Sequence, residues 1–111
     1  MIIDFHAHLY PRAFMDEIAR YGSRYGITLQ QGEGRETLHF EDILFWVYER
    51  SFHDEALRIG QLDEAGVDLQ VLSMGPPMAY WADPELGLRL CRIMNDEVAR
   101  TVERYPQRFI G

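Results

Sequence analysis

Two histidines near the start of the chain, His6 and His8, have the spacing of a pair of metal ligands. They lie in residues 1–9, where alternating apolar residues predict a buried strand that ends before Pro11. Since a strand directs residues i and i+2 to one side, both imidazoles should face the same point. Neutral imidazole binds zinc, iron, manganese and similar ions. The segment therefore predicts a metal site; the alternative is a pair of partly buried histidines bonded to the backbone.

Strand alternation gives this segment a polar face, with Asp4, His6 and His8, and an apolar face, with Ile3, Phe5, Ala7 and Leu9. Asp4 then has two interpretations. It either orients a metal ligand as an outer hydrogen-bond partner, or it bonds to nearby backbone.

A second group of candidates follows a later strand. Tyr80 and Trp81 lie in the segment "MGPPMAYWA", which its Gly-Pro-Pro predicts to be a loop. They are candidate substrate-binding residues, and the alternative is packing against a neighbouring loop. His39 and His53 are interpreted as packing residues.

The elements that must position these residues follow from periodicity and from turn signals. Residues 43–48 are compatible with either a strand or a helix. The other expected elements are a helix over 11–21, a hairpin of 27–31 and 36–40, a helix over 53–65 closed by Gly66, a strand over 67–73, a helix capped by Asp83 that ends at Tyr105-Pro106, and the start of a strand at 108–111.

Strand, helix, strand, helix and the start of a strand make a βαβαβ order, which predicts an α/β fold with a parallel sheet. Three parallel strands cannot close a barrel. We therefore expect residues 1–111 to form a single incomplete domain, from which the C-terminal remainder is absent. In barrel enzymes the chemistry lies at the C-terminal ends of the strands, which is where His6 and His8 fall on the first strand.

Composition restricts the class of partner. The 111 residues carry a formal net charge of −7 and contain 47% hydrophobic and 26% charged residues, as an ordinary globular protein does. Excess negative charge argues against nucleic acid and anionic membranes. Without a signal peptide or an apolar span, the default expectation is a cytoplasmic protein. The single cysteine, Cys91, is expected in the core.

Three longer sequence motifs resemble those of a known protein family. "IDFHAHLYP" resembles the first-strand motif of the amidohydrolase superfamily. "LRIGQLDEAGVDLQVLSMGPPMAYWADPE" and "LCRIMNDEVARTVERYPQRFIG" resemble the aminocarboxymuconate-semialdehyde decarboxylase-like branch of the amidohydrolase-2 family. The resemblance covers the whole chain, most weakly at 12–50. It implies the N-terminal part of a (β/α)8 TIM barrel, with the first two βα units and the start of the third strand.

The resemblance also implies one divalent metal ion, often zinc, with His6 and His8 as two of its ligands. In this family the other ligands are a histidine and an aspartate on later strands, and neither has a counterpart here. The implied activity is decarboxylation or hydrolysis of a small carboxylated or cyclic organic molecule. The motifs favour a carboxy-lyase. The alternatives are a C–N or C–O hydrolase, or an inactive remnant that acts through protein association; a homo-oligomer is compatible with either.

One position departs from the family pattern. Decarboxylases of this branch hold a substrate carboxylate with an arginine, and Trp46 falls at that position. Arg50 is close but out of register. The residues present do not identify a general base.

Overall fold

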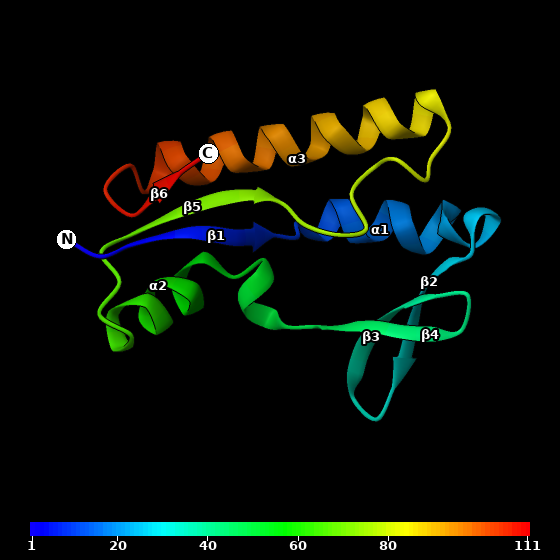
Figure 1. The fold of residues 1–111 in the computed structure, drawn as a ribbon, viewed down its shortest axis with the longest axis horizontal. Coiled ribbons are helices and arrows are strands. Elements are labelled where there is room, and N and C mark those ends of the chain that lie inside the picture. Colours follow the sequence, from blue (N-terminus) through cyan, green and yellow to red (C-terminus); the bar gives the residue numbers. More distant parts are fainter.

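The computed structural model describes residues 1–111, which form two separate three-stranded sheets. The parallel sheet has the order β1-β5-β6 and the antiparallel sheet the order β2-β3-β4 (Figure 1). The strands are β1 (Ile3–Leu9), β2 (Ile27–Gly32), β3 (Arg35–Phe40), β4 (Ile43–Tyr48), β5 (Leu69–Met74) and β6 (Phe109–Ile110). The helices are α1 (Arg12–Tyr21), α2 (Glu55–Glu64) and α3 (Pro84–Arg104), with short 3-10 turns at Gly22–Tyr25 and Arg50–Phe52.

The expected element order is therefore confirmed, and the ambiguous segment 43–48 is a strand that extends the predicted hairpin. The second helix begins later than the predicted residue 53. Asp54 accepts a hydrogen bond from the backbone N–H of Leu57 and so caps α2, which leaves His53 outside the helix. Asp83 caps α3 in the same way, through the N–H groups of Glu85 and Leu86.

An extra residue in β1 changes which side chains share a face of the parallel sheet. Asp4 lies beside Gln70 of β5, but Ala7 lies beside Leu72, so three steps on β1 match two steps on β5. This is a β-bulge at Phe5 and His6, opposite Val71. Because paired residues share a face, Asp4 and Ala7 both lie on the face of Gln70 and Leu72. The predicted common face for Asp4, His6 and His8 is wrong for Asp4, because a regular alternation cannot include the bulge.

Only one face of the parallel sheet is covered by helices. Ala7 and Leu72 pack there with Leu62 of α2 and Phe109, beside Val98 and Val102 of α3. Phe5, expected on a buried face, is 76% exposed, because the bulge turns it away from the helices.

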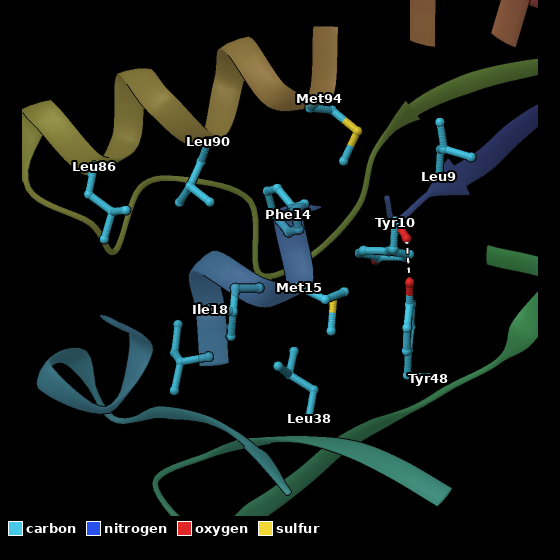
Figure 2. Packing of buried hydrophobic residues seen from close by; sticks show 11 residues of the cluster. Leu9, Tyr10, Phe14, Met15, Ile18, Leu38, Tyr48, Leu86, Leu90 and Met94 are labelled. Carbon is cyan, nitrogen blue, oxygen red and sulfur yellow. Dashed lines mark hydrogen bonds between the residues drawn. The ribbon is translucent and has the colours of Figure 1, made fainter. Parts of the chain in front are cut away.

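The larger core lies where α1 meets α3 and the antiparallel sheet (Figure 2). Phe14, Met15 and Ile18 of α1 are fully buried, and Leu90 and Met94 of α3 pack against them. The Tyr48 hydroxyl donates a 2.7 Å hydrogen bond to the carbonyl oxygen of Tyr10, which fixes the end of β4 to the residue after β1. The inserted sheet thus supports the end of the strand that carries both histidines.

Two smaller findings complete the comparison with the sequence. Cys91 is half-buried rather than a core residue, because it lies beside the apolar stripe of α3 and not within it. None of the helices combines the length and the apolar character needed to cross a bilayer.

Candidate metal centre

His6 and His8 lie together at the C-terminal half of β1. Their ring centroids are 4.8 Å apart and the rings meet edge to face, with an interplanar angle of 75°. His8 lies beside Ser73, on the face of the sheet opposite Gln70 and Leu72. The two predicted ligands therefore converge on the face that no helix of this chain covers.

Ser73 is the hydrogen-bond partner of Nδ1 of His8. The Ser73 hydroxyl oxygen lies 3.2 Å from His8 Nδ1 and 3.2 Å from the carbonyl oxygen of Ala7. When the hydroxyl donates to Ala7, a neutral His8 holds its proton on Nδ1 and donates it to Ser73. This arrangement leaves the lone pair of Nε2 free for a metal ion.

The surroundings of His8 also favour the neutral ring. Burial lowers the pKa of His8, and the neighbouring His6 lowers it further, whereas a hydrogen bond to the backbone of Ser73 acts in the opposite direction. Metal ions bind the unprotonated imidazole, so a lowered pKa keeps the ligand in its binding form.

Gly75 allows the loop after β5 to pass close to His8. A Cβ atom at this position would lie 2.7 Å from Cγ of His8 and would overlap the hydroxyl of Tyr10. The Tyr10 hydroxyl donates to the carbonyl oxygen of Pro76 at 2.8 Å, which holds the loop in place. Only glycine fits between the loop and the imidazole.

Asp4 bonds to backbone, as the second interpretation of this residue predicts. Its Oδ1 accepts a 3.1 Å hydrogen bond from the backbone N–H of His6, and its Oδ2 accepts from Nε2 of Gln70 at 2.8 Å. These hydrogen bonds, Gln70 first, lower the pKa of Asp4. The carboxylate does not bond to either imidazole ring.

No third histidine, cysteine, aspartate or glutamate side chain joins the pair, since no cluster of three such groups that could hold a metal ion occurs in the chain. His53 is exposed and stacks on Tyr48, with ring centroids 5.2 Å apart. His39 lies in β3, where its Nε2 is 3.0 Å from the hydroxyl of Thr37. His39 thus lies in the predicted hairpin, and His53 packs against an aromatic ring as expected.

Tyr80 and Trp81 follow β5 in the loop that starts beside His8, but their surroundings differ. Tyr80 is 91% exposed. Trp81 packs edge-on against Tyr25, at 5.4 Å between centroids, and its Nε1 donates to the carbonyl oxygen of Met78. The Trp81 ring is therefore part of the packing, and the Tyr80 ring is accessible to a ligand.

The two residues near the family's arginine position have other partners. Trp46 donates from Nε1 to the carbonyl oxygen of Pro76 and packs against Tyr10, at 4.5 Å between centroids. Arg50 forms an ion pair with Asp54, with Nη2 2.8 Å from Oδ2. Neither presents a free positive charge to a carboxylate.

The largest groove in the chain is separate from the imidazole pair. It has a volume of about 560 Å³ and lies between β5 and α3, with Leu72, Met94 and Val98 among its mostly apolar lining. Ser73 reaches both the groove and His8, but neither histidine lines the groove.

Three residues of this region were missed in the sequence: Ser73, Gln70 and Arg58. Ser73 and Gln70 belong to the apolar strand segment "VDLQVLS", and Arg58 belongs to a helix with charged residues throughout. A polar residue inside a buried strand was the available signal for Gln70. Its partner in β1 depends on the register of two strands more than sixty residues apart.

Known proteins relate to this chain by sequence and by structure, although no model of a protein family matches it. It is 32% identical to the 2-amino-3-carboxymuconate-6-semialdehyde decarboxylase of Dictyostelium discoideum, over 98% of this chain and 31% of that protein. It is also 32% identical to the decarboxylase of the same name from Caenorhabditis elegans, over 97% of this chain and 27% of that protein. The chain thus spans about a third of the length of these curated relatives.

Two solved structures resemble this chain over nearly its whole length. The crystal structure of the 5-carboxyvanillate decarboxylase LigW from Sphingomonas paucimobilis matches 99% of this chain and 33% of its own, with a TM-score of 0.70 and 26% identity. An amidohydrolase II structure matches 98% of this chain and 29% of its own, with a TM-score of 0.64 and 19% identity. The α/β fold is consistent with the N-terminal part of an amidohydrolase barrel. Over nearly its whole length, this chain is related to the aminocarboxymuconate-semialdehyde decarboxylase-like branch of the amidohydrolase-2 family.

Proposed function

We propose that this chain supplies two ligands, His6 and His8, to one divalent metal ion, with zinc as the ion. The observation that carries the proposal is the pair of imidazoles with ring centroids 4.8 Å apart, one of them bonded through Nδ1 to the hydroxyl of Ser73. This donor set suits zinc. Two ligands hold an ion only weakly, because zinc sites in proteins take three or four. Residues 1–111 therefore act as the first part of a larger (β/α)8 domain.

The proposed activity is that of a carboxy-lyase acting on a small carboxylated organic molecule. Both curated relatives and LigW are named decarboxylases, of 2-amino-3-carboxymuconate-6-semialdehyde and of 5-carboxyvanillate, and this favours decarboxylation over hydrolysis. A metal ion bound at such a site acts as a Lewis acid that polarises substrate oxygens and lowers the pKa of bound water. The residues of this chain orient that site: Ser73 is hydrogen-bonded to Nδ1 of His8, and Gly75 leaves room for the ring.

Tyr80 and Trp81 are proposed to contribute to substrate binding. Tyr80 offers an exposed ring on the loop after β5, and Trp81, on the same loop, packs edge-on against Tyr25 and so holds the loop in place. Because Trp46 carries no charge and Arg50 is paired with Asp54, recognition of the substrate carboxylate is assigned to another cation.

The metal site is tested by titrating zinc into the ¹⁵N-histidine-labelled chain and following the imidazole nitrogens by NMR. We expect Nε2 of His6 and His8 to shift together, and the nitrogens of His39 and His53 to stay unchanged. His8→Ala should abolish the shift at His6, because one remaining ligand binds too weakly. The matched control is His53→Ala, which removes an exposed histidine that stacks on Tyr48. Equal responses of all four histidines, or a His6 shift that persists in His8→Ala, would refute the proposal.

A further inference from the structure

A buried arginine on α2 reaches the strand that carries the histidines. Arg58 is only 7% exposed. Its Nε donates to the carbonyl oxygen of Ser51 at 2.9 Å, its Nη1 to Oε1 of Gln70 at 2.9 Å, and its Nη2 to the carbonyl oxygen of His8 at 2.7 Å. Burying a guanidinium is costly unless its donors are satisfied, and here every nitrogen donates a hydrogen bond.

The hydrogen bonds continue from Arg58 to His6. Nε2 of Gln70 donates to Oδ2 of Asp4 at 2.8 Å, and Oδ1 of Asp4 accepts from the backbone N–H of His6 at 3.1 Å. The network formed by Arg58, Gln70 and Asp4 therefore begins at the carbonyl of one candidate ligand and ends at the N–H of the other. It also places the carboxylate of Asp4 as the counter-charge of the buried arginine.

The network spans the β-bulge. A bulge leaves the extra residue unpaired and disrupts the ladder locally, so its backbone groups need other partners. Asp4 supplies one to the N–H of His6 within the bulge, and Arg58 holds the carbonyl oxygen of His8, two residues further along β1. Because the network lies on the helix-covered face and the imidazoles on the other, it reaches them only through the backbone of β1.

We propose that Arg58, acting through Gln70 and Asp4, is a positioning residue that holds the bulged backbone of β1 so that the His6 and His8 rings converge. The importance of this role for metal binding rests on the proposed function, whereas the convergence of the rings does not.

Arg108 provides a matched control, with its side chain bonded to residues that precede β5. It also donates three hydrogen bonds, to the carbonyl oxygens of Asp68 and Val67 and to Oδ1 of Asp63, but none reaches β1 near the histidines. Arg58→Met and Arg108→Met each remove three hydrogen bonds while keeping an unbranched apolar side chain. A general loss of stability should therefore appear in both variants.

The first readout needs no metal: the nuclear Overhauser effect between ring protons of His6 and His8. We expect it in the wild-type chain and in Arg108→Met, and we expect its loss in Arg58→Met. The second readout is zinc affinity, which should fall about tenfold or more in Arg58→Met and change less than twofold in Arg108→Met. If Arg58→Met does not fold, Arg58→Lys is compared with Arg108→Lys, since a single ammonium cannot reach all three acceptors.

Retention of the ring contact in Arg58→Met or Arg58→Lys would overturn the inference. A different outcome is also possible: the ring contact depends on Arg58, but zinc does not shift the nitrogens of His6 and His8. That outcome would refute the proposed metal site and leave the positioning role intact.

Discussion

The Ser73 hydroxyl oxygen lies 3.2 Å from Nδ1 of His8 and 3.2 Å from the carbonyl oxygen of Ala7. When the hydroxyl proton goes to Ala7, the Ser73 oxygen accepts from Nδ1–H of His8 and favours the tautomer with a free Nε2. The residue lies on a different strand from His8, sixty-five positions along the chain.

Removing this hydroxyl should weaken metal binding without unfolding the chain. Ser73→Ala is expected to lower zinc affinity about 10-fold or more, as loss of an outer hydrogen-bond partner does at metal sites. Ser73→Thr keeps the hydroxyl and should retain most of the affinity. Ser23→Ala, at an exposed serine of the 3-10 turn, is the control. The measurement is the zinc titration of the His8 ring nitrogens, and an unchanged affinity in Ser73→Ala would show that Ser73 does not orient His8.

Adding a single methyl group at Gly75 should disturb the site sterically. Gly75→Ala places a carbon 2.7 Å from Cγ of His8, so we expect a loss of about 1–3 kcal/mol in the free energy of unfolding and a displaced imidazole. Gly60→Ala is the matched control: nothing lies within 4 Å of its Cβ in the interior of α2, and it should stabilise the chain by about 0.5–1 kcal/mol. Chemical denaturation together with the His8 ring shifts tests both variants. A neutral Gly75→Ala would contradict the close approach of the loop.

Truncating side chains of α3 should lower the free energy of unfolding only on the face of the helix that packs against α1. Leu90 is fully buried, and Leu90→Ala is expected to cost about 2–5 kcal/mol in the free energy of unfolding. Leu88, two residues earlier in the same helix, is 53% exposed, and Leu88→Ala should change that free energy by less than about 0.5 kcal/mol. Equal losses, measured by urea denaturation, would mean that α3 packs through a different face.

Alkaline pH should destabilise the chain through two buried tyrosines. Burial raises the pKa of Tyr10 to about 12 and raises that of Tyr48 further. An unfolded tyrosine has a pKa of about 10, so above pH 10 the unfolded chain binds fewer protons than the folded chain. Stability is then complete below about pH 10 and is lost as the pH rises toward the folded values.

Tyr48→Phe separates the two contributions of this hydroxyl. It removes the hydrogen bond to the carbonyl oxygen of Tyr10, which should cost about 1 kcal/mol at neutral pH, and it should make the alkaline loss less steep. Tyr80→Phe, at an exposed ring, should change neither quantity. The measurement is the free energy of unfolding from pH 7 to 11 for the wild-type chain and both variants. A wild-type free energy that does not fall above pH 10 would contradict the burial of the Tyr10 and Tyr48 hydroxyls.

Most of the fold could be predicted from local signals. Asp83 and Pro84 begin α3 where a capping aspartate and a proline predict it, and the glycine-containing turn at 33–34 joins β2 to β3 as expected. The start of α2 was predicted two residues early, because His53 is as compatible with a helix as its neighbours and only the capping bond of Asp54 fixes the boundary.

The site was only half predictable. The convergence of His6 and His8 follows from strand spacing, but the place of Asp4 depends on a bulge, which alternation cannot indicate. Ser73, Gln70 and Arg58 owe their roles to the register between β1 and β5 and to the approach of α2. The contacts of β1 with α2 and β5 join residues that are fifty or more positions apart in the sequence. No local sequence pattern can indicate such contacts.

The bulge also determines what a deletion in β1 would do. Phe5 is 76% exposed, so exchanging its side chain should disturb little around it. Deleting Phe5 altogether would restore one-to-one pairing with β5 and place His6 opposite Val71. Asp4 and Ala7 would keep the face of Gln70 and Leu72, and His6 and His8 would keep the other face. In this segment the register of β1 against β5 is therefore a stricter requirement than the residue at position 5.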